Sequence, residues 1–488
     1  DKDRVVEYIK QKYGDRYVVN IGTQSTLGTR DVLNNIARVL GLPEREIQPL
    51  VDVLPSDLNE TSNEQLYNDN KNTEYKNLVD NNKTLKMVYD LAVKLECLFK
   101  NMSVHASGIL ISPSDINVPL AKQHDSVFTQ YDMHNVESLG YIKFDFLGLK
   151  TLKVIESTVK KINGGRFGKF SIYDVDYWHP DKETMALINA GKTTCIFQWE
   201  SEGYKRLISE LHPDTFNELI DLNTLYRPGP MESGMTKQYI NRKFGRELVV
   251  DIHPLLKGRL KRMGLPLFQE EIMMMCNVLA GFTMAEADTI RKAIGKKDKD
   301  LLNEQRVKFI DGCKKTGDMD EGKASELWGK VEKFGRYSWN LSHGLAYTIL
   351  SYWTAYLSAH YPAEFFAAHL DVYKEYDRLL VITNEARLRG IKIIPPDVNL
   401  STIDHAVDGD KVYMTLDIVK GIGDKARDAI LEERVQHGVF KNFDDFCDRV
   451  PKTSCNAVIK EALICAGAFD AIQAGDVVAR HTQNGAEF

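Results

Sequence analysis

Asp145 is the side chain whose surroundings point most directly to chemistry. It lies in the run Gly140-Tyr-Ile-Lys-Phe-Asp-Phe-Leu-Gly-Leu149, which is apolar enough to form a strand. Lys143 is two residues away, and alternate residues of a strand share a face, so the two charges would lie together. A carboxylate at a strand end between apolar residues is typical of a metal ligand. The alternative is an ordinary hydrogen-bonded strand carboxylate, and the run alone favours that alternative.

Arg227 is suited to a phosphate. It follows Thr224-Leu-Tyr226 and precedes Pro228-Gly-Pro230, so it sits at a rigid corner between two helices. A guanidinium held in that way can be presented to a phosphate oxygen. Many Arg-Pro corners are purely structural, so this signal is weak by itself.

His343 and Tyr347 form a second candidate pair. They are four residues apart at the start of a predicted helix over 342–360, with Asn340 or Ser342 as its cap. A helix start favours anions, and a His/Tyr pair there can hold a triphosphate and stack on a base or sugar. The alternative is a helix that buries an aromatic stripe, which is our interpretation of Tyr352 and Trp353.

Two segments carry a positive charge that the whole chain does not. The net charge of the 488 residues is −6, yet nine Lys and Arg face three acids between Arg227 and Arg262, and nine face four between Arg291 and Lys315. The second segment begins Arg291-Lys-Ala-Ile-Gly-Lys-Lys297, which places Lys296 and Lys297 about one turn beyond Arg291. These segments predict a local polyanion surface. Solvated helix faces with internal ion pairs are the alternative.

The run Ile418-Val-Lys-Gly-Ile-Gly-Asp-Lys-Ala-Arg427 has the form of a helix-hairpin-helix. Gly421 and Gly423 would let the backbone turn tightly, so that amides at the start of the second helix face a phosphate. Lys420 and Lys425 flank the turn, which favours DNA-backbone binding without base readout over a plain turn between helices. Segments 443–450 and 458–469 predict a second, paired unit.

The positioning elements are mostly helical. Strands are predicted at 104–111, 141–147 and 412–414, and Gly22–Gly28 is predicted to be a turn. The remaining periodicity predicts helices at 1–13, within 29–100, at 285–294, 301–313, 323–334 and 342–360, and from 415 to about 471. The length suggests roughly three domains. Seven scattered cysteines indicate reduced thiols in a cytoplasmic protein, and no apolar run approaches the length of a membrane span.

Taken together, the motifs resemble the C-family replicative polymerases, the alpha subunits of bacterial DNA polymerase III. The resemblance runs in order from about residue 1 to 472. Eight runs carry it: Val104-His-Ala-Ser-Gly108, Ile142–Leu149, Phe197-Gln-Trp-Glu-Ser201, Leu225-Tyr-Arg-Pro-Gly-Pro-Met231, Leu267-Phe-Gln-Glu-Glu271, Arg291–Lys297, Asn340-Leu-Ser-His-Gly-Leu-Ala-Tyr347 and His360-Tyr-Pro-Ala-Glu-Phe365. No single run is decisive, but eight in register are very specific.

The resemblance implies an α+β multidomain fold. It contains part of a polymerase-beta-like nucleotidyltransferase palm, an inserted helical thumb, large mainly helical fingers and a tandem helix-hairpin-helix. The implied boundaries are palm at 1–25 and 103–165, thumb at 26–102, fingers at 166–400, tandem helix-hairpin-helix at 401–472, and a loose tail at 473–488.

The implied reaction is template-directed addition of a nucleotide to a primer 3′-hydroxyl by two-metal phosphoryl transfer. Asp145 matches the third palm carboxylate and a Mg²⁺ ligand, with Lys143 beside it. Arg227, Arg291, His343 and Tyr347 match finger positions near the nucleotide. The implied partners are primer-template DNA and deoxynucleoside triphosphates, and a sliding clamp and other replisome subunits through regions absent from this sequence.

The paired Asp-x-Asp of the palm is the main departure from the family. In the family it lies just upstream of the segment that matches Asp1–Lys12, whereas Asp1 and Asp3 fit the acids of a helix start. We therefore expect the chain alone to be inactive and one or both of the two Mg²⁺ ions to be shared with carboxylates outside it. Those carboxylates would come from a longer polypeptide or from a second one. The alternative function is a non-catalytic DNA-binding or complementing half of a split polymerase.

Overall fold

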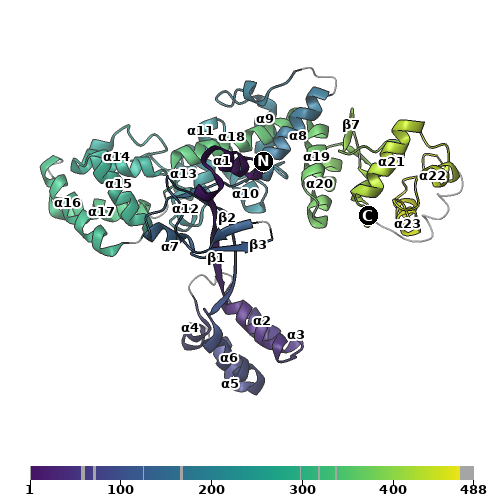
Figure 1. Cartoon of the computed structure of the whole chain (residues 1–488). Helices are drawn as coiled ribbons and strands as arrows, with labels where there is room; N and C mark the ends of the chain where they lie inside the picture. Colours follow the sequence, from purple (N-terminus) through teal and green to yellow (C-terminus); the bar gives the residue numbers. More distant parts are fainter. Residues whose placement is uncertain are drawn as a thin grey trace. The chain divides into compact units, whose positions relative to one another are not determined.

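The computed structural model describes residues 2–55, 61–69, 73–124, 126–164, 169–296, 298–316, 319–335 and 338–472. The chain divides into two compact units, Asp1–Leu149 and Lys150–Phe488 (Figure 1). Strands and helices occur in both units, and helices dominate, as the mixed fold predicted from the sequence requires.

A five-stranded sheet organises the first unit. Its order is β3-β4-β1-β2-β5, and β5 lies at an edge, antiparallel to β2. Its strands are β1 (Val18–Thr26), β2 (Phe99–Ile111), β3 (Leu120–Gln123), β4 (Ser126–Thr129) and β5 (Lys143–Asp145). The sequence prediction of a turn over Gly22–Gly28 is wrong as far as Thr26, because Gly22–Thr26 belong to β1 and pair with β2, Gly22 opposite Val104. A Cβ at Gly22 would lie 2.1 Å from the Thr129 carbonyl oxygen, so glycine here allows close strand packing.

One helix packs on each face of this sheet. α1 (Lys2–Tyr13) buries Ile9 against Val18 and Ile109. α7 (Met133–Ser138) buries Val136 in a cluster that contains Leu110. Ile109 and Leu110 are consecutive strand residues, so the two helices cover opposite faces. Asp3 lies in the first turn of α1 as predicted, and Asp1 lies outside the described residues.

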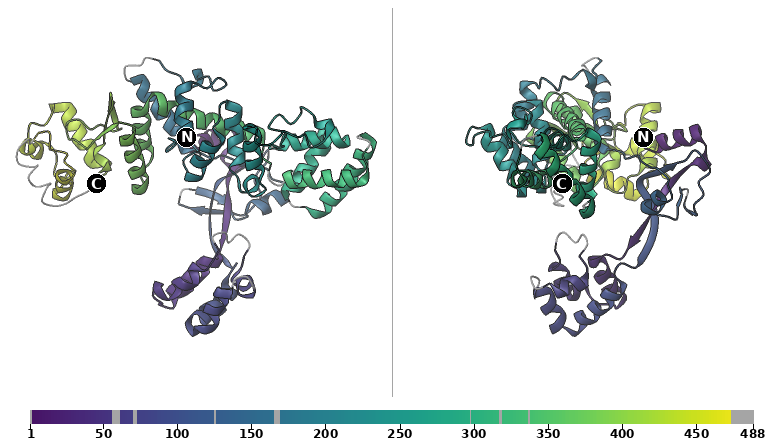
Figure 2. Two further views of the ribbon diagram at one scale, coloured as in Figure 1. Left: turned by 180° about the vertical axis from the view of Figure 1, so that it is seen from behind. Right: turned by 90° about the vertical axis from the view of Figure 1, so that its left-hand side faces the viewer.

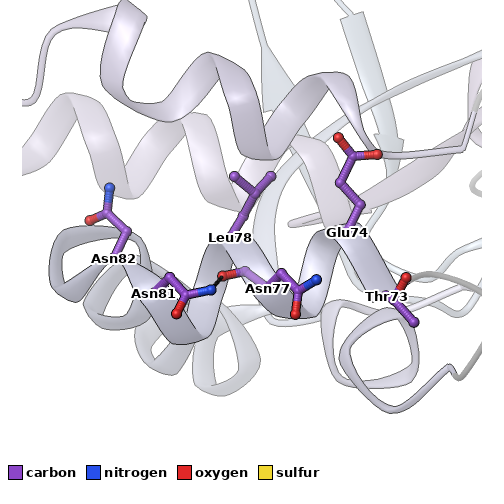
Figure 3. A pocket seen from close by; sticks show the side chains of 6 residues that line it. All are labelled: Thr73, Glu74, Asn77, Leu78, Asn81 and Asn82. Carbon is purple, nitrogen blue, oxygen red and sulfur yellow. Dashed lines mark hydrogen bonds between the residues drawn. The ribbon is translucent and has the colours of Figure 1, made fainter.

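A helical group is inserted between β1 and β2. Its helices lie together beyond the ends of β1 and β2 (Figure 1). They share a core of their own that includes Val32, Leu50 and Tyr75. Its helices are α2 (Thr29–Val39), α3 (Glu44–Asp52), α4 (Asn63–Asn68), α5 (Thr73–Asn81) and α6 (Lys83–Leu95). An open cleft on α5 and its turn into α6 is lined mainly by polar side chains, and the Asn81 amide donates to the Asn77 carbonyl there (Figure 3).

The second unit has a helical body centred on α18 (Leu341–His360). Its core gathers large side chains such as Trp199, Phe216 and Tyr352. The other helices of the body are α8 (Lys150–Gly164), α9 (Lys182–Asn189), α10 (Glu202–Leu211), α11 (Phe216–Leu225), α12 (Pro228–Glu232), α13 (Met235–Lys243), α19 (Pro362–Val372) and α20 (Tyr376–Leu388). The predicted helix over 342–360 is thus confirmed, and Asn340 is its cap.

Four helices between α13 and α18 form a separate bundle with its own core. They are α14 (Gln269–Ala280), α15 (Met284–Lys296), α16 (Lys299–Thr316) and α17 (Glu321–Gly335). The last three confirm the helices predicted over 285–294, 301–313 and 323–334. Figure 2 shows these four helices side by side from two further directions.

The end of the described chain holds a small sheet and three helices. The sheet order is β6-β8-β7, with β6 (Lys392–Ile394), β7 (Ala406–Asp408) and β8 (Lys411–Tyr413). The helices α21 (Asp424–His437), α22 (Phe443–Arg449) and α23 (Ala457–Cys465) share one core around Phe446 and Phe469. The predicted tail over 473–488 lies outside the described residues. Among the helices described, none combines the length and apolar character that crossing a bilayer requires.

Candidate active site and nucleic-acid interface

Asp145 ends the edge strand β5 and is about half exposed, with 51% of its side chain accessible. Register places it opposite Gly108 of β2. Ser107 Oγ donates to Asp145 Oδ1 at 2.7 Å, and Lys143 Nζ lies 3.2 Å from Asp145 Oδ2. The Lys143–Asp145 pair predicted from strand alternation is confirmed, and Ser107 is an added partner.

These contacts keep Asp145 ionised. The Ser107 hydroxyl lowers the pKa of the Asp145 carboxyl most, and the ammonium of Lys143 and the nearby His105 lower it further against the opposing effect of burial. His105 also braces the irregularity in the pairing of β2 with β1, because its Nδ1 accepts from the backbone N–H of Gly108 at 2.8 Å. An ionised, half-exposed carboxylate is suited to a hard divalent cation.

Asp145 could supply one ligand position, which is not a complete metal site. Among the described residues, no three His, Cys, Asp or Glu side chains gather closely enough to hold a metal ion. Lys143 already neutralises one carboxylate oxygen. The donor set therefore fits Mg²⁺ as a single ligand, and two ions would need further carboxylates.

Arg227, His343 and Trp339 come together from two separate segments. Arg227 is the N-cap residue of α12 and has an extended backbone, and Pro228 is the first helical residue. This is the corner that the sequence predicted. Its guanidinium lies 3.2 Å from the centre of the Trp339 ring, and the Trp339 and His343 ring centres are 4.9 Å apart. This is a cation–π contact with an edge-on aromatic neighbour.

Tyr347 extends the same stack by one helical turn. Its ring lies 4.0 Å from that of His343, nearly parallel, and Phe197 packs 5.4 Å away on its other side. The i,i+4 pair expected from the sequence is therefore confirmed as a stacked pair. We call Arg227, Trp339, His343, Tyr347 and Phe197 the finger stack.

The electrostatics of the finger stack favour a neutral imidazole. Burial, and then the charge of Arg227, lower the pKa of His343 below its ordinary value. Burial also lowers the pKa of the Arg227 guanidinium, with Tyr204 acting in the opposite direction. The stack thus presents one cation beside polarisable rings, a combination that suits a phosphorylated, base-bearing ligand.

Buried hydrogen bonds position this stack. The Asn223 amide donates to Thr348 Oγ1 of α18 at 2.8 Å and accepts from the Trp199 indole N–H at 2.8 Å. Both side chains of that link are buried, so α11 and α18 are held at a fixed spacing.

Arg291 is engaged within its own helix. It donates to Asp288 at 2.7 Å, and Lys292 pairs with the same carboxylate at 2.8 Å. Lys296 ends α15, but its side chain and the whole of Lys297 lie outside the described residues. The alternative of internal ion pairs thus holds for Arg291 and Lys292.

The basic segment 227–262 is also partly internal. Lys243 is only 8% exposed and pairs with Asp214 and Glu218. Arg262 donates to Asp221 at 2.6 Å and to Glu271 at 2.8 Å. Carboxylates from other helices therefore neutralise Lys243 and Arg262, which a charge count cannot show. Only the other cations of this segment are left to form the predicted polyanion surface.

The predicted hairpin has a tight turn but lacks a full first helix. A single 3₁₀ turn, Leu416–Ile418, precedes it in place of the expected apolar helix. Gly421 has φ +94°, which favours glycine, whereas Gly423 is extended and caps α21. Lys420 and Lys425 are exposed beside it, and α21 turns Ala426 and Ile430 into the core, as expected.

Trp339 and Ser107 are the site residues that sequence reasoning missed. Ser107 lay in a quoted motif, but its contact with Asp145 spans 38 residues. Trp339 directly precedes the cap of α18, and an aromatic at that position is a signal that was present in the sequence.

Three family models match the chain. The bacterial DNA polymerase III alpha NTPase domain matches residues 1–148, its finger domain matches 151–317, and a helix-hairpin-helix motif matches 390–476. The curated DNA polymerase III alpha subunits of Aquifex aeolicus, Thermus aquaticus and Bacillus subtilis are each 36% identical over 96% of this chain. The chain spans 42%, 39% and 42% of their lengths, respectively. The boundary between the first two models coincides with the boundary between the two compact units.

Proposed function

The chain belongs to the family of bacterial DNA polymerase III alpha subunits, and we propose that it carries part of the active site of a DNA-directed DNA polymerase. The reaction is addition of a deoxynucleotide to the 3′-hydroxyl of a primer. The observation that carries the proposal is the finger stack. Its residues lie in distant parts of the sequence, and those that we expect near the nucleotide come together there.

In this proposal each unit has a separate task. Asp145 contributes one ligand to Mg²⁺, which neutralises charge on the transferred phosphate when bound. Lys143 holds that carboxylate in place. Arg227 faces a phosphate and the His343–Tyr347 rings stack on the base or sugar. The sheet of the first unit acts as the palm, helices α2–α6 as the thumb, and the body with α14–α17 as the fingers.

The hairpin before α21 binds the duplex product. Gly421 shapes the turn and Gly423 starts the helix, so backbone amides face a phosphate. Lys420 and Lys425 add charge beside it. The predicted second unit, α22 and α23, packs in the same core and would extend this grip.

Nucleotide binding tests the finger stack directly. We expect a fluorescent deoxynucleoside triphosphate to bind the chain with its primer-template, and Arg227→Ala or His343→Ala to weaken binding roughly tenfold, the loss of one charged contact or stacked ring. Arg246→Ala is the control, since Arg246 is an exposed arginine that packs on Phe244. Equal affinities for all four proteins would exclude the stack as the nucleotide site.

A second candidate function is that of a non-catalytic, complementing half of a split polymerase. It is favoured by the absence of a three-ligand acidic cluster among the described residues. We expect the chain with Mg²⁺, primed template and nucleotides to extend no primer by itself. Primer extension that Asp145→Ala abolishes would overturn this second candidate.

A further inference from the structure

Glu270 makes an unusual contact across two helices. It lies in the first turn of α14, but its carboxylate binds the start of α18, 70 residues away. Glu270 Oε1 accepts from Asn340 Nδ2 at 3.1 Å, and both carboxylate oxygens accept from the Leu341 backbone N–H, at 3.1 and 3.0 Å. A carboxylate at this position also offsets the positive end of the α18 dipole.

This contact fixes the orientation of the Asn340 cap. With its NH₂ group held by Glu270, the amide turns its oxygen toward the helix, where Asn340 Oδ1 accepts from the His343 backbone N–H at 3.0 Å. Glu270 therefore determines the geometry of the first turn of α18, which carries His343.

The neighbours of Glu270 hold Trp339 in the same way. The Gln269 backbone N–H donates to the Trp339 carbonyl at 2.8 Å, and Phe268 and Trp339 form a short parallel bridge. Glu271 turns inward instead and accepts from the backbone of Leu267 and Phe268. Three consecutive residues of α14 thus fix both the start of α14 and the start of α18.

We infer that Glu270 is a positioning residue for the nucleotide site, acting through Asn340 to hold His343 against Trp339 and Tyr347. Because Glu270 belongs to the α14–α17 bundle, it also ties that bundle to the finger stack. This inference rests on the proposed function for the identity of the ligand, a nucleotide. The positioning of His343 by Glu270 does not depend on that function.

A reversed hydrogen bond tests the role. Glu270→Gln loses the charge and one acceptor, and Asn340→Asp places two carboxylates face to face. The double variant Glu270→Gln/Asn340→Asp restores the pair, since the Gln amide donates to the new carboxylate while its oxygen still accepts from Leu341. We expect each single change to weaken nucleotide binding by the chain roughly tenfold, and the double variant to recover most of it.

The ring protons of His343 provide a measurement that needs no ligand. In the stack they lie over Tyr347 and beside Trp339, so their NMR signals carry ring-current shifts, assigned by His343→Gln. Both single changes should reduce these shifts and the double variant should restore them. Glu286→Gln is the matched control, because Glu286 also caps a helix of the bundle, accepting from Thr283.

Unchanged His343 shifts in Asn340→Asp, which removes the amide that Glu270 holds, would overturn the inference. So would weaker binding that the double variant fails to restore, since that variant keeps both the net charge and the hydrogen bond between the two side chains. If the wild-type chain binds no deoxynucleoside triphosphate, the proposed function fails, and the His343 shifts then decide the positioning role by themselves.

Discussion

Asp145 shows how a partner on the adjacent strand can set the charge of a site. The Ser107 hydroxyl is the largest influence on its pKa, ahead of Lys143. We expect Ser107→Ala to raise the pKa of Asp145 toward its ordinary value, as measured by carboxyl-carbon NMR titration. Ser103→Ala, four residues earlier in β2, is the control. An unchanged pKa in Ser107→Ala would mean that Lys143 dominates.

His369 gives a residue-scale prediction about pH. Complete burial in α19 lowers its pKa to about 4, and its Nδ1 lies 2.9 Å from the Phe365 carbonyl. The unfolded chain takes up this proton near pH 6.5 and the folded chain does not, so stability is present above pH 6.5 and falls as pH drops toward 4. The loss from this group at pH 5 is about 2 kcal/mol.

The check is urea unfolding of the wild type and His369→Asn at pH 7 and pH 5. The asparagine amide can replace the Nδ1–H donor but does not titrate. Its free energy of unfolding should therefore fall less on acidification, by about 2 kcal/mol. Parallel pH dependence in the two proteins would contradict a buried neutral His369.

At the scale of elements, the hairpin before α21 separates two glycines that look alike in the sequence. Gly421 has a positive φ that a branched residue adopts only with strain, whereas Gly423 is extended and has open space at its Cβ position. We expect Gly421→Val to weaken duplex binding roughly tenfold and Gly423→Ala to leave it nearly unchanged.

Fluorescence anisotropy with two duplexes of unrelated sequence, at one fixed salt concentration, measures this effect. Contacts to the phosphate backbone predict the same loss for both duplexes. A loss confined to one sequence, or equal effects of both substitutions, would contradict the proposed role of the turn.

Arg262 joins three helices of the second unit. It binds Asp221 of α11 and Glu271 of α14, and Tyr239 of α13 donates to the same Asp221 at 2.8 Å. Burial raises the pKa of Asp221 to about 6, against the opposing charge of Arg262. Arg262→Met should lower the free energy of unfolding by about 3–5 kcal/mol, because it leaves buried carboxylates without a cation.

Chemical denaturation measures the change, and exposed Lys257→Met is the control. Arg262→Met combined with Asp221→Asn should recover part of the loss, since it removes one uncompensated charge. A loss below about 1 kcal/mol in the single variant would show that water already reaches this ion network.

At the scale of the molecule, each compact unit has its own hydrophobic cores, and the boundary falls between Leu149 and Lys150. We expect a chain of residues 150–472 to fold alone and to melt cooperatively, with the near-ultraviolet circular dichroism of its buried Trp199. Broad, non-cooperative melting would show that the second unit depends on the first.

Features that depend on neighbouring residues could be predicted from the sequence, and features that depend on distant residues could not. Pro228 after Arg227, Asn340 as a helix cap, the i,i+4 pair His343–Tyr347 and the Gly421 turn are local patterns, so the sequence predicted them well. The helices predicted over 1–13, 285–294, 301–313, 323–334 and 342–360 begin and end within about three residues of the prediction, because their periodicity is also local.

The sequence by itself determined which residue types stand at each corner, cap and turn, and it identified the family. Only the tertiary structure decided which of them meet. It placed Trp339 under Arg227, brought Ser107 to Asp145, and buried Lys243 among acids that a charge count leaves unpaired. It also made a strand of Gly22–Thr26 within the predicted turn, since strand pairing with distant residues overrides a glycine's local preference. Such contacts depend on packing between distant segments, which composition and spacing do not encode.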